Sequence, residues 1–268
     1  EDPLTGVKRR VRGHAVARDR RPHVGGVSVV GQPATGDLAP GALVLDGLLI
    51  EGSVTVEPGS LGSLRVAHCT IADGPAAESA AELRVGEGNV GLTVDVERTI
   101  CGPIAVDPSA HLLSLRDSIV DGHGAPALTG PAVAIERSTI LGSAAVRSIQ
   151  ASNAIFAGVL DVERRQTGCL RYSYLPIASR GPRRFRCQPT GEADAVRVVP
   201  AFTSVTSGDP GYGQLAADCP PEISRGADDE GEMGAFNFVQ AAHRMANLRA
   251  RLDEYLRVGL EAGTFFVT

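Results

Sequence analysis

The sequence contains no tryptophan, and aromatic residues make up only 4% of its 268 residues. Flat side chains on which a sugar ring could stack are therefore scarce. No run of about 18 apolar residues occurs, so we predict no membrane-spanning helix. The hydrophobic share is nevertheless 43%, which is enough for a folded core. Small aliphatic and β-branched side chains must build that core, and together with the abundant glycine and proline they are typical of repetitive β-architectures.

Neither sign of charge dominates, because the formal net charge is −5, and this argues against nucleic acid as the main partner. A basic stretch within residues 1–40 is the exception. We expect it to be a solvated arm or linker that leads into the first strands, with contact to a polyanion as the alternative. Its members are Lys8, Arg9, Arg10, Arg12, Arg18, Arg20 and Arg21. Since the first residue is Glu1, we expect a fragment or a processed product. The localisation stays open, with a secreted or particle-associated protein as the working hypothesis.

The strongest pattern is an eight-residue repeat that reads apolar, any, apolar, any, any, small, any, apolar. It occurs six times, at residues 43–50, 64–71, 94–101, 113–120, 133–140 and 149–156. The last residues of successive copies are 16 to 21 positions apart, apart from one interval of 30. We explain that interval by an insertion at residues 73–89, whose alanine, glycine and glutamate content predicts a protruding loop.

This repeat predicts an all-β fold, a right-handed parallel β-helix (β-solenoid), over residues 41–175. Each coil would supply two or three short strands, and stacked neighbours would bury what one coil cannot bury alone. A glycine follows most copies and permits a tight turn, with positive φ if needed. These glycines are Gly52, Gly102, Gly122, Gly142 and Gly158.

Two charged columns test the register of this stack. If successive copies align, Glu97, Arg116 and Glu136 form one outward ladder of alternating sign, and Arg98, Asp117 and Arg137 form the complementary one. Opposite charges on neighbouring strands stabilise a sheet by about 0.2–1 kcal/mol a pair. The ladders therefore support three adjacent coils.

The five cysteines contain no CxxC pair and have no histidine at metal-ligand spacing, which disfavours a zinc site. Cys69 and Cys101 lie in the repeats, where we expect core positions. Cys169, Cys187 and Cys219 come later in the chain, and whether two of them form a disulfide stays open because it depends on the compartment.

The last part of the chain, residues 176–268, lacks the repeat. We predict irregular structure followed by a helix over residues 241–262, because Leu248, Leu252, Leu256 and Leu260 recur at every fourth position. This apolar stripe would cap the solenoid, with an oligomer contact as the alternative.

Several segments resemble bacterial β-helix repeat proteins associated with phage-tail-like contractile injection particles. The resemblance rests on RGADDEGEMGAF at 225–236, NLRARLDEYL at 247–256, GLEAGTFFVT at 259–268, VERRQTGCLRYSY at 162–174 and RRFRCQ at 183–188. It implies a C-terminal module of a longer protein, with a structural or surface-contacting role. It brings over no catalytic residues.

Enzymes with a parallel β-helix set carboxylates and basic residues on one face. The candidates for such chemistry are Asp107, His111, Asp117, Asp121 and His123. The charge ladder already accounts for Asp117, and Asp121 begins an Asp-Gly-His-Gly stretch typical of a turn. We therefore assign no catalytic, cofactor-binding or metal-binding residue.

Our leading hypothesis is a non-enzymatic structural or surface-contacting module of a larger secreted or phage-tail-like assembly. Its partners would be protein components of that assembly, or a cell-surface glycan, and an oligomer is compatible with it. The alternative is a carbohydrate-active enzyme, a polysaccharide lyase or hydrolase.

Overall fold

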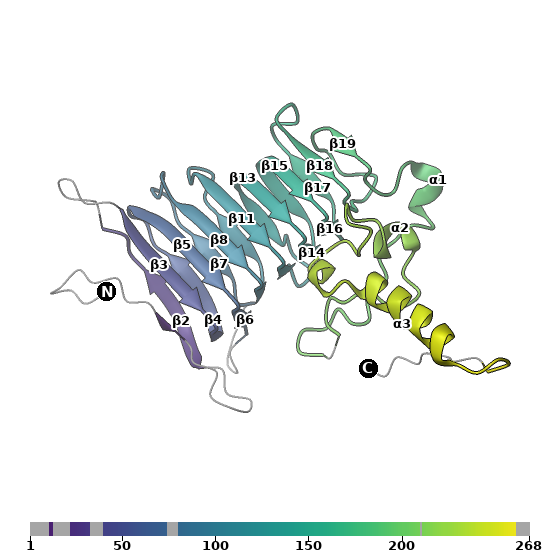
Figure 1. Ribbon diagram of the computed structural model, residues 1–268. Helices are drawn as coiled ribbons and strands as arrows, with labels where there is room; N and C mark the ends of the chain where they lie inside the picture. Colours follow the sequence, from purple (N-terminus) through teal and green to yellow (C-terminus); the bar gives the residue numbers. More distant parts are fainter. Residues whose placement is uncertain (1–10, 13–21, 33–39, 74–79, 210, 261–268) are drawn as a thin grey trace.

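The computed structural model describes residues 11–12, 22–32, 40–73, 80–209 and 211–260. The chain is a parallel β-solenoid with few helices, which confirms the predicted fold class. Figure 1 shows the strands stacked along one axis, with the helices beside the C-terminal part of the stack. The predicted basic arm lies outside the described residues, apart from the backbone of Arg12.

Three parallel sheets form the walls of the solenoid. The first contains β1 (Val11–Arg12), β3 (Gly41–Asp46), β5 (Leu61–Ala67), β8 (Thr93–Glu97), β11 (Leu112–Arg116), the second halves of β13 (Leu128–Glu136) and β15 (Ala144–Ser152), β18 (Gly168–Arg171) and β19 (Arg184–Phe185).

The other two walls share strands that bend from one into the next. The second contains the first halves of β2 (His23–Val29) and β4 (Leu49–Val56), then β6 (Thr70–Ala72), β9 (Ile100–Cys101), β12 (Ile119–Asp121), β14 (Thr139–Leu141) and β16 (Ile155–Phe156). The third contains the second halves of β2 and β4, β7 (Leu83–Val85), β10 (Ile104–Val106), the first halves of β13 and β15, and β17 (Leu160–Val162).

All six copies of the repeat align in the predicted register. Their first residues pair in one continuous column, which runs Leu43, Leu64, Val94, Leu113, Val133 and Ile149. Apolar side chains of the copies point inward and form one core cluster that extends from Leu45 to Cys187. The pairing continues past the sixth copy, through β18 to β19.

The predicted loop at residues 73–89 is wrong in part. Leu83 and Val85 are buried, and β7 pairs with β4 on one side and with β10 on the other. Asn89 is buried too, and its side-chain oxygen accepts a hydrogen bond from the Leu61 backbone N–H at 3.2 Å. The surrounding alanine, glycine and glutamate hid a three-residue strand that has the same alternation as the other coils.

Positive φ angles occur at a position that the sequence did not indicate. The residue before the small position of each coil has φ between +45° and +72°, in the order Gly47, His68, Arg98, Asp117, Arg137, Asn153, Tyr172 and Arg186. Most of the predicted turn glycines do not have a positive φ, and glycine is needed there because other backbone atoms come too close to leave room for a Cβ. A Cβ on Gly102 would lie 2.0 Å from the Ala81 carbonyl oxygen, so the close approach of two coils requires glycine there.

A ladder of hydrogen bonds connects the small positions of successive coils, which lie between the first and second walls. The hydroxyl of Ser118 accepts from the Thr99 backbone N–H at 3.1 Å and donates to the Arg116 carbonyl oxygen at 2.7 Å. Ser138 and Ser173 repeat this arrangement in their own coils. Cys69 and Cys101 are buried in the core as predicted, while all five cysteines are free thiols, including Cys169, Cys187 and Cys219.

The C-terminal segment packs along the second wall of the solenoid. It contains α1 (Glu192–Ala195), α2 (Pro221–Ser224), the 3₁₀ helix η1 (Asn237–Val239) and α3 (Ala241–Tyr255). Two small apolar clusters join it to the wall. The first groups Ile155 and Tyr174 with Val198, Cys219, Ile223 and Met233, and the second groups Ile119 with Tyr212 and Ala235.

Helix α3 begins at the predicted residue but ends at Tyr255 instead of Ala262. A turn follows, in which the Leu260 N–H donates to the Arg257 carbonyl and Gly259 has φ +89°. Leu248 and Leu260 are 42% and 60% exposed, so the leucine stripe is not buried along its length. No helix among the described residues is long and apolar enough to cross a membrane.

Candidate functional site

Asp117, one of the sequence candidates for chemistry, is enclosed by arginines. Its side chain is only 3% exposed, so the complementary ladder is buried at this residue. Its two oxygens lie 2.7 Å from Arg137 Nε and 3.8 Å from Arg98 Nε, on the neighbouring coils. The hydrogen bond to Asp117 raises the pKa of Arg137. The alternation of charge is confirmed, and the carboxylate serves to join three coils.

Asp121 lies at the end of β12 and joins the solenoid to the C-terminal segment. Its carboxylate accepts a hydrogen bond from the Tyr212 hydroxyl at 2.6 Å and another from the His123 backbone N–H at 2.8 Å. Burial, together with the neighbouring carboxylate, raises the pKa of Tyr212. The structure thus brings Asp121 and His123 together at the predicted turn, and adds Tyr212, whose role no sequence signal indicated.

The remaining candidates, Asp107 and His111, take no part in the hydrogen bonds of Asp121. Asp107 accepts a hydrogen bond from the Ser109 backbone N–H at 2.8 Å within a local turn, and His111 is exposed. Among the described residues, no group of three His, Cys, Asp or Glu side chains could hold a metal ion. The five candidates therefore do not form one site.

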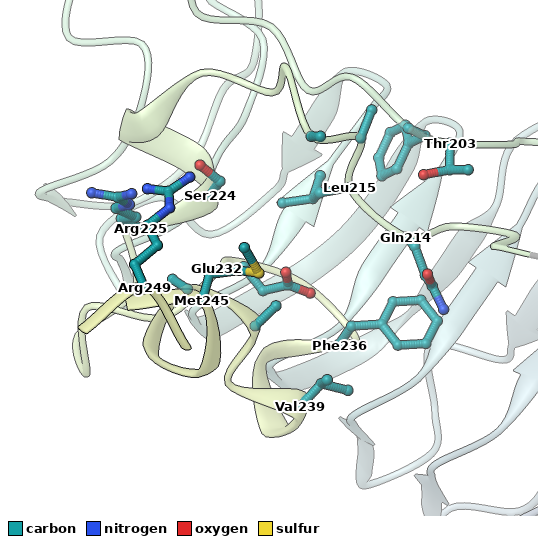
Figure 2. Close-up of a pocket in the computed structure, with 15 residues that line it drawn as sticks. Thr203, Gln214, Leu215, Ser224, Arg225, Glu232, Phe236, Val239, Met245 and Arg249 are labelled. Carbon is teal, nitrogen blue, oxygen red and sulfur yellow. The ribbon is translucent and has the colours of Figure 1, made fainter. Parts of the chain in front are cut away.

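A cavity of about 610 Å³ opens instead within the C-terminal segment (Figure 2). Four parts of the chain surround it: residues 202–203 and 214–217, the end of α2, the loop at 226–236, and residues 241–249 of α3 together with η1. Most of its walls are apolar side chains, namely Phe202, Leu215, Ala216, Ala217, Phe236, Val239, Ala241, Ala242 and Met245. A volume of this size suits a small ligand.

Glu232 is the single carboxylate in the described lining of this cavity. The residue is only 8% exposed, and Figure 2 shows its carboxylate within the cavity, between Met245 and Phe236. Burial raises its pKa to about 7. No hydrogen bond or ion pair reaches this carboxylate from the part of the chain that the structure describes. Neither of its oxygens is completely buried, so the carboxylate is open to the cavity and an occupant could pair with it.

Two arginines line the same cavity at a distance from Glu232. Figure 2 shows the guanidinium groups of Arg225 and Arg249 at one end, near Ser224, while Glu232 lies further in. Burial is the one cause of the raised pKa of Glu232, so neither arginine offsets it. Neither arginine forms an ion pair with a described residue. Both arginines are exposed to solvent, so the lining combines a carboxylate with two solvated guanidinium groups, none of them paired with a described residue.

Hydrogen bonds to the solenoid fix the loop that carries Glu232. Asn153 and Asp228 form a reciprocal pair, at 2.7 Å between the side chains and 3.0 Å from the Asp228 backbone N–H to the Asn153 side-chain oxygen. The Ala235 N–H donates to the Thr139 hydroxyl at 3.0 Å. A Cβ on Gly234 would lie 2.6 Å from that same hydroxyl, so only glycine fits. These contacts make the cavity part of a rigid surface.

Asp229 connects the same loop to the start of α3. Its side chain accepts hydrogen bonds from Gln240 at 2.7 Å, Gly231 at 2.9 Å and Asn237 at 3.1 Å. Burial acts to raise the pKa of Asp229, but these hydrogen bonds outweigh it and lower the pKa. The stretch at residues 225–236, which supports the sequence resemblance, thus builds one wall of the cavity.

No protein family, no curated protein and no solved structure matches the chain.

Proposed function

We propose that the chain is a non-enzymatic β-solenoid module that acts as a rigid spacer or contact surface in a larger assembly. The observation that carries this proposal is the continuous bonding between coils. Hydroxyls at the small position and charges at the position before it connect neighbouring coils inside the wall. Such a stack resists bending because each coil is bonded directly to the next.

The wider context of this module is also a proposal. The resemblance of residues 225–268 supports a phage-tail-like contractile injection particle or another secreted assembly. The partners would then be the protein components of that particle, and a cell-surface glycan is the alternative contact.

The enzyme hypothesis receives less support from the geometry. Glycoside hydrolysis uses a pair of carboxyl groups on either side of the scissile bond, whereas Glu232 is the single carboxylate in the described lining of the cavity. Asp117 is paired with two arginines, and Asp121 is bonded to Tyr212. We therefore favour the structural role.

Rigidity can be measured between two spin labels on one column of the first wall. Arg65 and the native thiol Cys169 are five strand spacings apart in that column. Their Cα atoms should lie about 24 Å apart at roughly 4.8 Å a strand. When Cys169 and the new cysteine of Arg65→Cys both carry a spin label, double electron–electron resonance should give one narrow distance distribution. A broad distribution would contradict the spacer role.

A second experiment addresses the enzyme alternative directly. The purified chain is incubated with a panel of acidic and neutral polysaccharides, and new reducing ends and unsaturated products are measured. We expect no release above that of a heat-denatured control. Product formation by the native chain that is lost in Asp121→Asn would overturn the non-enzymatic proposal.

A further inference from the structure

The cavity in the C-terminal segment has the features of a binding site, and this inference does not depend on the role of the solenoid. Its walls are apolar, its loop is bonded to the solenoid, and its charged side chains have no partner among the described residues. Glu232 is the most informative of them, because burial disfavours the charged form of its carboxylate and a cation beside it would favour that form.

The arginines favour an anionic group in the ligand, whereas Glu232 favours a cationic one. Arg225 and Arg249 line one end of the same cavity, and two guanidinium groups at one place bind a carboxylate strongly through charge-assisted hydrogen bonds. Leu215, Ala216 and Met245 line the same cavity and offer an apolar surface. An occupant that satisfies every part has a cation and an anion joined by an apolar stem.

We propose that this cavity binds a small zwitterion of the ω-amino acid class, with its ammonium group at Glu232 and its carboxylate at Arg225 and Arg249. The methylene stem packs against Leu215, Ala216 and Met245. Phe236 lies beside Glu232 and adds apolar surface at this end of the cavity. A purely anionic ligand would leave Glu232 unpaired, and a purely cationic one would meet the arginines.

The test is a calorimetric titration of the full chain with a series of ω-amino acids, from 4-aminobutanoate to 8-aminooctanoate. One length should bind best, because the two charged ends of the cavity are fixed relative to each other. Hexylamine and hexanoate, which each carry one charge, should bind about tenfold more weakly than the best zwitterion. Equal affinity for hexanoate and the zwitterions, no dependence on length, or no binding at all would overturn the proposal.

Two variants assign the ends of the ligand. Glu232→Gln should weaken the best zwitterion by about tenfold and leave hexanoate unchanged, because only the ammonium contact is lost. Glu230→Gln is the matched control, since Glu230 is an exposed carboxylate in the same loop, and it should stay within about twofold, well below the loss of one charged contact.

Arg249→Ala should weaken both the zwitterion and hexanoate by about tenfold. Its control is Arg244→Ala, which removes an exposed arginine of α3 outside the described lining. Arg249 is itself exposed, so this variant keeps the proposal falsifiable if Glu232→Gln fails to fold. An unchanged affinity in Arg249→Ala would show that the arginines do not hold the ligand.

Discussion

Ser118 shows how one small side chain joins two coils. Ser118 is fully buried. Its hydroxyl accepts a hydrogen bond from the Thr99 backbone N–H on the neighbouring coil and donates one to the Arg116 carbonyl of its own coil. Ser118→Ala leaves that buried N–H without its acceptor, which costs about 1–3 kcal/mol. We expect a lower urea midpoint of unfolding.

Ser114 provides the control for this substitution. It lies in the same coil but is only half-buried, so Ser114→Ala should change the midpoint little. Equal midpoints for the two variants would contradict a structural role of the hydroxyl ladder.

Glu232 makes stability depend on pH. Its pKa rises from 4.5 to about 7 on folding, so the folded chain binds a proton more tightly than the unfolded chain does. The stabilising effect is fully present below pH 4.5 and is lost as the pH rises through about 7, because the unfolded carboxyl ionises first. At about 1.4 kcal/mol for each unit, this loss amounts to about 3 kcal/mol.

Glu232→Gln should remove this part of the pH dependence. The glutamine has a similar shape and stays neutral, so the variant should be more stable than the native chain at pH 8 and of similar stability at pH 4.5. Thermal unfolding at both pH values measures the difference. A native chain that loses no stability between these pH values relative to the variant would argue against a buried, unpaired carboxylate.

At the scale of elements, Tyr212 attaches the C-terminal segment to β12. Its hydroxyl donates to the buried Asp121, which lies on the solenoid wall. Tyr212→Phe removes one of the two hydrogen bonds to this carboxylate, and we expect a loss of about 1–3 kcal/mol. Hydrogen exchange should become faster in residues 201–236.

The first coils should keep their protection in this variant, because a solenoid unfolds locally. Tyr255→Phe is the matched control, since Tyr255 is 81% exposed at the end of α3. Uniformly faster exchange along the whole chain in Tyr212→Phe would contradict a local attachment.

Elements with a local period could be predicted from the sequence, and elements built by distant contacts could not. The copy at residues 113–120 predicts its register, because only one alignment buries Leu113 and also pairs Arg116 with Glu136. The strand β7 was missed because three residues are too short for a period to show. The cavity was missed for a different reason: Phe202, Glu232 and Arg249 come from separate, non-repeating segments.

At the scale of the whole molecule, the solenoid should tolerate added coils if the charged columns keep their alternation. Repeating residues 99–137 after Arg137 adds two coils. The outward column then reads Glu97, Arg116, Glu136, Arg116, Glu136, and every neighbour is an opposite charge. The contacts of Asp121, Thr139 and Asn153 with the C-terminal segment are also retained by the last copy.

Repeating only residues 118–137 adds one coil and breaks this order. Glu136 then lies next to a second Glu136, and Arg137 next to a second Arg137, in the register that the strands impose. Like charges directly opposite each other on neighbouring strands are destabilising. We expect the two-coil variant to unfold cooperatively near the native midpoint, and the one-coil variant to unfold at lower temperature.

Two measurements, the dependence of stability on ionic strength and the length of each variant, distinguish charge repulsion from a general intolerance of insertions. Small-angle X-ray scattering should show that the two-coil variant is longer than the native chain by about 10 Å, since each coil adds about 4.8 Å. Raising the ionic strength to about 1 M should bring the one-coil variant closer to the native midpoint, because screening weakens repulsion between exposed charges. If the two-coil variant were the less stable of the two, the alternating columns would not determine how the coils stack.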